Sequence, residues 1–152
     1  MRKSLQIFLI LISVFCFGQK LHYFIGKDSL IGVKNDKNEI VIPAEIPNYQ
    51  GINNGEIILE KFIYLIVPTK NIKQEKNSFG AYYDKKGNFL YQPFAFDNGA
   101  DYFSEGYQRF VKNGKVGFVD RNANIVIEAK YNFVSRFNYG YAVYCNGCDW
   151  EK

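Results

Sequence analysis

The sequence is poor in the residue types on which most enzyme and metal sites depend. It has one histidine, three cysteines, one methionine and one tryptophan among 152 residues. It also lacks Gly-x-Ser-x-Gly, a P-loop, a dinucleotide-binding glycine pattern and His-Glu-x-x-His, which are the common motifs of hydrolysis, nucleotide binding and zinc catalysis. We therefore expect a non-catalytic protein without a metal or a cofactor. An unrecognised hydrolase stays an alternative, because the carboxylate pairs of glycosidases are spaced in three dimensions and not along the chain.

A calcium loop is the metal site that comes closest to a match. Asp97 and Asp101 stand in the stretch Asp-Asn-Gly-Ala-Asp. The distal glutamate that such a loop needs is missing at the required spacing. A polar turn is therefore the favoured interpretation of this segment.

Strong charge of either sign is missing too. The chain has 19 basic and 15 acidic residues. Two of the basic residues and none of the acidic ones lie within residues 1–18, so residues 19–152 have a net charge of +2. Because nucleic-acid binding depends on a concentrated basic surface, which no basic cluster provides here, we exclude nucleic acid as a partner.

The N-terminus has the pattern of a secretory signal. Arg2 and Lys3 precede an almost wholly apolar run over residues 5–17, and Gly18 is a small residue that suits cleavage after it. An uncleaved anchor is disfavoured because the run is short for a membrane span. Lipid attachment at Cys16 is disfavoured because the preceding residue is a large phenylalanine. We expect residues 1–18 to be a signal peptide, and residues 19–152 to be one secreted or periplasmic domain without a membrane span.

Aromatic and β-branched residues are abundant. The chain has 12 tyrosines and 14 phenylalanines, and isoleucine and valine gather in short runs that suit a pleated sheet. No stretch after the signal peptide has helical periodicity. The sequence therefore predicts an all-β fold.

A repeated unit underlies this composition. Residues 26–43 align with residues 111–128 without a gap when Gly32 is set on Gly117, and residues 79–93 join them through Gly80 if one residue is inserted. Repeats of this length are typical of repetitive architectures. We predict an array of β-hairpin repeats, arranged as an antiparallel meander or a solenoid.

The turns of the repeat predict its strand register. Asn113 and Gly114 both accept the positive φ of a type I′ hairpin turn. Such a turn places Phe110 opposite Gly117, where a bare glycine leaves room for the ring. The next turn ends in Gly87, Asn38 or Ala123 in the three copies. Because alanine does not tolerate the left-handed region well, we expect the turn at Ala123 to have a different shape.

These residues resemble the WG repeat family. The run Lys-Val-Gly-Phe-Val-Asp at 115–120, followed by Ile-Val-Ile at 125–127 and by Tyr131, is similar to the family's Lys-Trp-Gly-Tyr-Ile-Asp, Val-Ile-Pro and tyrosine. The tryptophan of the motif is replaced in every copy. The resemblance implies a β-hairpin array of the kind found in bacterial proteins, commonly exported and with no general catalytic activity. It covers units near residues 24–43, 79–110 and 111–144, with the start of a further unit at 145–152, whereas residues 44–78 fit poorly.

Two cysteines, Cys145 and Cys148, flank an Asn-Gly pair near the C-terminus. In an exported protein such a pair is usually oxidised, and the turn would bring the two residues opposite each other. A disulfide is the favoured interpretation. Half a zinc site is the alternative, and it would need two more ligands.

Large side chains alternate over residues 137–143. A strand there would place Phe137, Tyr139, Tyr141 and Val143 on one face. We therefore predict a half-buried strand, and packing of Tyr139 and Tyr141 into the core is favoured over binding.

Three functions remain open after this reading. The first is an interaction or scaffold module of the bacterial cell envelope that binds a protein partner. The second is a carbohydrate-binding surface on which tyrosine rings stack against a glycan, and the third is the unrecognised hydrolase. The residues between 79 and 150 hold 19 of the 27 aromatics. If this half carries the function, Tyr139, Tyr141 and Trp150 are weak candidates for the binding surface.

Overall fold

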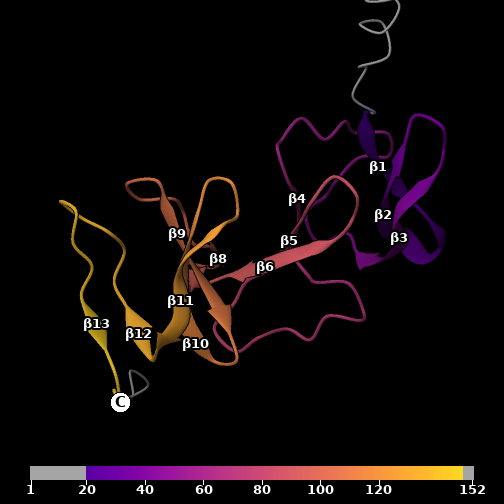
Figure 1. The fold of residues 1–152 in the computed structure, drawn as a ribbon. Coiled ribbons are helices and arrows are strands. Elements are labelled where there is room, and N and C mark those ends of the chain that lie inside the picture. Colours follow the sequence, from indigo (N-terminus) through magenta and orange to yellow (C-terminus); the bar gives the residue numbers. More distant parts are fainter. Residues whose placement is uncertain (1–19, 149–152) are drawn as a thin grey trace, which may run out of the picture.

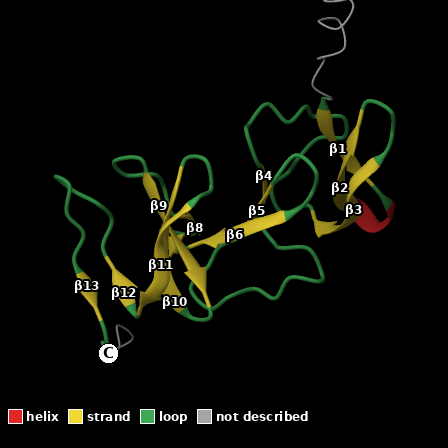
Figure 2. Ribbon diagram, viewed as in Figure 1, coloured by secondary structure: helices red, strands yellow, loops and turns green. Residues whose placement is uncertain are grey.

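Antiparallel strands make up almost all of the protein. The computed structural model describes residues 20–148, and Figures 1 and 2 show that part of the chain. Its single helical segment is a short 3-10 turn, η1 (Lys27–Ser29), and no helix in the described range is long and apolar enough to cross a membrane. The predicted all-β class is confirmed. The predicted signal peptide and Trp150 lie outside the described residues.

The strands follow one another as three-stranded meanders, which we call units. The first unit is β1 (Leu21–Ile25), β2 (Leu30–Asn35) and β3 (Ile40–Pro47); the second is β4 (Ile63–Leu65), β5 (Ala81–Tyr83) and β6 (Phe89–Pro93); the third is β9 (Tyr107–Lys112), β10 (Lys115–Asp120) and β11 (Ile125–Tyr131). Two short pairs follow the second and third units: β7 (Ala95–Phe96) with β8 (Gly99–Ala100), and β12 (Phe133–Val134) with β13 (Tyr144–Cys145).

The segment that fits the repeat poorly supplies a strand nonetheless. Leu65 pairs with Ala81, so the first strand of the second unit lies at β4, separated from β5 by a long connection. A repeat is recognised in a sequence when its strands follow one another at constant spacing. The long connection between β4 and β5 breaks that spacing in the second unit. The second unit is therefore a full three-stranded meander, although the sequence alignment found only its last two strands, β5 and β6.

Sheet pairing joins two of the three units. β6 pairs with β9, so the second and third units form one six-stranded sheet, whereas the first unit forms its own sheet. Figure 1 shows this first sheet at one end of the molecule and β12–β13 at the other. The outer edge of β1 is covered by residues 55–58, where the backbone N–H of Tyr23 donates to the carbonyl of Glu56 at 2.9 Å and that of Ile58 donates to the carbonyl of Leu21 at 2.8 Å.

The turn that links the second and third strands is the same in all three units. In the third unit the Ala123 N–H donates to the Asp120 carbonyl at 3.0 Å, and in the second the Gly87 N–H donates to the Asp84 carbonyl at 3.0 Å. The φ of Ala123 is 62°, against 62° for Asn38 and 83° for Gly87. The expectation of a different third turn was wrong. The hydrogen bonds that Asp120 makes to residues 122 and 124 hold the alanine in the left-handed region.

The Asn113-Gly114 hairpin has the predicted register. Phe110 lies opposite Gly117, and Val111 lies opposite Val116. A Cβ added at Gly117 would stand 2.7 Å from the Phe110 ring, and one at Gly32 would stand 2.7 Å from the Phe24 ring. These two glycines are therefore equivalent, and each gives its space to an aromatic ring on the neighbouring strand.

Gly80 belongs to a different position from the one the alignment gave it. The shared turn begins at Asn35, Asp84 and Asp120 in the three units. Three residues before it stand Gly32, Ala81 and Gly117, so Ala81 and not Gly80 is the counterpart of the two glycines. Gly80 has a φ of 72°, which favours glycine for conformational reasons. An added Cβ would also lie 2.4 Å from the carbonyl oxygen of Leu65.

Candidate functional site

The C-terminal tyrosines stand on a tight turn and not on a strand. The backbone N–H of Asn138 donates to the carbonyl of Tyr141 at 2.8 Å, and the N–H of Tyr141 donates back at 3.1 Å. Between them Tyr139 and Gly140 have positive φ values of 52° and 77°. The predicted strand over 137–143 was wrong, because a two-residue turn with glycine at its second position reverses the chain in the middle of the alternating pattern.

This turn has a counterpart 34 residues earlier. Ser104 and Tyr107 exchange the same pair of backbone hydrogen bonds around Glu105 and Gly106. The two turns are joined directly, because the Ser104 hydroxyl donates to the carbonyl of Phe137 at 2.7 Å. Tyr107 and its repeat counterpart Tyr141 thus occupy the same place in successive units.

Equivalent positions differ sharply in exposure. Arg109 and Phe110 are 3% and 2% exposed, whereas their counterparts Val143 and Tyr144 are 75% and 59% exposed. Tyr141 is 79% exposed, while Tyr107 is half-buried against Phe137, with ring centroids 5.0 Å apart. We call Tyr139, Tyr141, Val143 and Tyr144 the C-terminal face. Packing of Tyr139 and Tyr141 into the core, favoured by the sequence, does not occur.

A groove runs beside this face. It has a volume of about 520 Å³ and lies between the segment at 102–104 and the turn at 135–143. Tyr102, Tyr141 and Val143 supply apolar surface, and Ser104 and Asn138 supply polar groups. Tyr102 is 55% exposed, so two tyrosine rings are available to a ligand in the groove.

A buried ion pair supports one wall of the groove. Asp101 is 2% exposed and accepts hydrogen bonds from Arg109 Nε at 2.8 Å and from Arg109 Nη2 at 3.1 Å. Arg109 Nη1 donates to the carbonyl of Val134 at 3.0 Å, and its guanidinium lies 4.4 Å from the centre of the Phe94 ring. The polar turn predicted for Asp97 and Asp101 is therefore correct only at Asp97. Sequence reasoning missed the ion pair of Asp101 because Arg109 stands eight residues on, in β9, beyond the turn between Ser104 and Tyr107.

A second arginine, Arg136, lines the groove itself. Its guanidinium carbon lies 3.9 Å from the centre of the Tyr102 ring and 4.3 Å from that of Phe96. Nη1 is buried and makes no hydrogen bond to any of the residues between 20 and 148. Arg136 could not be identified from the sequence, because the residues around it match no known binding motif.

Cys145 and Cys148 are joined by a disulfide, with Cα atoms 5.9 Å apart. The bridge closes the Asn146-Gly147 turn, and the Gly147 N–H donates to Asn132 Oδ1 at 3.1 Å. Within the described range no three His, Cys, Asp or Glu side chains are grouped so as to hold a metal ion. The disulfide therefore links the two sides of the turn that follows β13.

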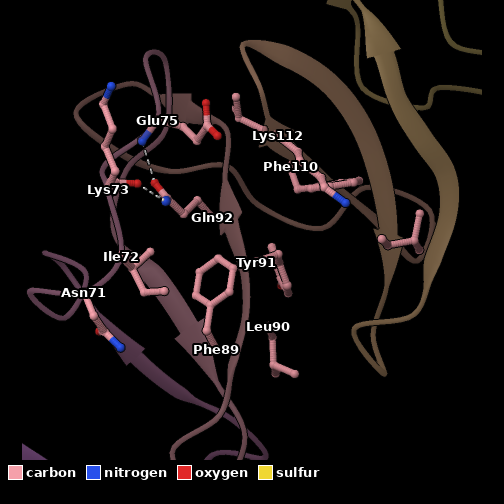
Figure 3. Close-up of a pocket in the computed structure, with 12 residues that line it drawn as sticks. Asn71, Ile72, Lys73, Glu75, Phe89, Leu90, Tyr91, Gln92, Phe110 and Lys112 are labelled. Atoms are coloured by element: carbon pink, nitrogen blue, oxygen red, sulfur yellow. Dashed lines mark hydrogen bonds between the residues drawn. The ribbon is translucent and has the colours of Figure 1, made fainter.

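A different cleft, of about 340 Å³, separates the loop at 71–75 from β6 and β9 (Figure 3). The buried Gln92 side chain crosses toward the loop, donating to the Lys73 carbonyl at 2.7 Å and accepting from the Glu75 N–H at 2.9 Å. Glu75 in turn accepts from the backbone of Asn113 at 2.9 Å and of Gly114 at 3.1 Å. The side chains of Gln92 and Glu75 therefore hold the loop against the sheet.

The fold defines an array of antiparallel meander repeats. Residues 81–115 and 117–147 each match the family model described as WG containing repeat. Both segments are therefore similar to WG-containing repeats, in agreement with the resemblance found in the sequence. No curated protein and no solved structure matches the chain.

Proposed function

We propose that the protein is an exported, non-catalytic interaction module of the bacterial cell envelope, and that its C-terminal face binds a protein partner. The observation that carries this proposal is the difference between successive repeats. Val143 and Tyr144 are exposed where Arg109 and Phe110 are buried. Tyrosine is among the residue types that contribute most contact energy at interfaces, and the exposed Val143 adds apolar surface beside the tyrosines.

Physical reasoning favours a protein over a glycan as the occupant. In the preceding unit, the positions equivalent to the C-terminal face are covered by protein groups, among them the Phe137 ring and the Val134 carbonyl. The Val134 carbonyl accepts from the Arg109 side chain, and the counterpart Val143 has no side-chain donor, so a partner can repeat only the aromatic contact. Val143 instead offers an apolar surface that a protein side chain covers better than a sugar ring does, so the carbohydrate-binding alternative has less support.

The test is capture of partners from the native envelope fraction by immobilised variants. Tyr141→Ala combined with Val143→Ala should reduce capture at least about tenfold, because the loss of two contact side chains at one surface should cost more than about 1.4 kcal/mol. Tyr49→Ala is the matched control, since Tyr49 is 73% exposed in the first half of the chain and should leave capture unchanged. Equal capture by all three proteins, at unchanged melting temperature, would exclude the C-terminal face. Export is tested separately by intact mass, which should show Gln19 as the first residue.

A further inference from the structure

Arg136 is the one guanidinium of the groove that lacks an anionic partner among the described residues. The positive charge of Arg109 is neutralised by Asp101. Both arginines contact the Phe96 ring, with the guanidinium carbon of Arg109 5.9 Å and that of Arg136 4.3 Å from its centre. No carboxylate between residues 20 and 148 forms an ion pair or a hydrogen bond with Arg136. One uncompensated positive charge is therefore fixed in the wall of the groove.

The fixing of this side chain suits it to receive a ligand. Stacking on Tyr102 and Phe96 restricts the guanidinium to one plane, so a ligand would not have to order a free arginine. Nη1 is buried, whereas Nε and Nη2 are not among the buried atoms, so a carboxylate in the groove can accept from these two groups in a bidentate manner. Tyr141 and Val143 stand along the same groove, so a ligand group at Arg136 would be continuous with contacts on the C-terminal face.

We propose that Arg136 binds the carboxylate of an aspartate or glutamate side chain of the protein partner. This inference rests on the proposed function, because it assigns the chemistry of the partner at the same surface. A carboxylate fits this position because its two oxygens match the planar fork of arginine. The neighbouring Ser104 and Asn138 offer further polar groups, while the tyrosine rings accept the apolar part of the side chain.

The first experiment titrates the wild-type protein with acetyl-Ala-Glu-Ala-amide and with its glutamine analogue. The readout is the NMR signal of Arg136 Nε–H, assigned by its loss in Arg136→Lys. The glutamate peptide should shift this signal and bind at least about fivefold more tightly than the glutamine peptide, because only the carboxylate forms a charge-assisted pair. Equal binding of the two peptides, or no shift, would overturn the proposal. Tighter binding of galacturonate than of the glutamate peptide would overturn it in favour of an acidic glycan.

The second experiment uses Arg136→Gln, with Arg121→Gln as the matched control. Arg121 also lies over an aromatic ring, 4.9 Å from the centre of Phe103, but is exposed and outside the groove. Arg136→Gln should remove the preference for the glutamate peptide, and Arg121→Gln should keep it. If Tyr141→Ala/Val143→Ala abolishes envelope capture while Arg136→Gln does not alter it, the proposed function stands and this inference fails. If neither variant alters capture, the proposed function itself fails.

Discussion

At the scale of single residues, close backbone approach explains the recurring glycine better than conformational freedom does. Gly117 has no positive φ, yet an added Cβ would lie 2.4 Å from the Ile127 carbonyl oxygen and 2.7 Å from the Ala129 nitrogen. Gly114, only three residues away, has a φ of 67° and open space around it. The two glycines of one hairpin are thus required for different physical reasons.

We predict that Gly117→Ala destabilises the protein more than Gly114→Ala does. At Gly117 the new methyl group meets backbone on the neighbouring strand, so the cost should reach about 3 kcal/mol, the upper end of the range for overpacking. At Gly114 the cost is that of a left-handed alanine, about 1 kcal/mol. Urea denaturation of both variants measures the difference. An equal loss of unfolding free energy would show that the strands separate at Gly117 without penalty.

The residue scale also shows the limit of sequence reasoning. The register around Asn113 followed from local turn chemistry, since a type I′ turn sets which residues face one another. The ion pair of Asp101 and Arg109 and the stacking of Arg136 did not, because each depends on where separate strands lie in space. Tyr139 and Tyr141 were misplaced because an alternating pattern was weighed above the turn signal of Gly140.

At the scale of the element, the repeated turn is stabilised by one aspartate in the second and third units, and by Asn35 in the first. Asp120 Oδ1 accepts from the backbone of Asn122 at 2.7 Å and of Asn124 at 2.9 Å, and Asp84 makes the same two bonds in the second unit, to Lys86 and Asn88. The hydrogen bonds from Asn124 hold the pKa of Asp120 below its ordinary 3.8. Burial pushes the pKa of Asp84 upward, but its hydrogen bonds outweigh this effect and the pKa is again lowered.

Because the pKa of each carboxyl group is lowered in the folded protein, the stability that these turns contribute falls at low pH. Because the folded pKa lies below the unfolded value, the stabilisation is complete above about pH 4 and is lost as pH falls through the folded pKa. We predict that Asp84→Asn combined with Asp120→Asn is less stable than wild type at pH 6, and that the gap narrows at pH 2.5. Unfolding free energies at the two pH values measure this. A gap that stays constant would mean that the carboxylate charge contributes nothing.

At the scale of the whole molecule, the units depend on one another. One hydrophobic cluster combines residues of the first unit, such as Ile31 and Val33, with Leu65 and Tyr83 of the second. The third unit is joined to the second through β6 and β9. No unit therefore buries its apolar face alone, as is usual for repeat proteins.

We predict that Leu65→Ala weakens the first unit as well as the second. Leu65 is fully buried, and its truncation should cost about 2–5 kcal/mol. Hydrogen exchange should show faster exchange of amides in β1–β3 together with those in β5. Leu59→Ala is the control, because Leu59 is 86% exposed and should change stability by less than about 0.5 kcal/mol. Unchanged protection in β1–β3 would show that the first sheet is independent.

The cover that residues 55–58 form over β1 has a consequence for assembly. A repeat array with an unpaired strand edge at each end can add further copies at both ends and grow into a filament. Here the backbone groups at the outer edge of the first strand are paired within the chain itself, so this edge does not offer a further copy a strand to pair with. If the proposed C-terminal face is the surface that binds, its partners attach from one side only, and complexes should stop at a single partner per chain.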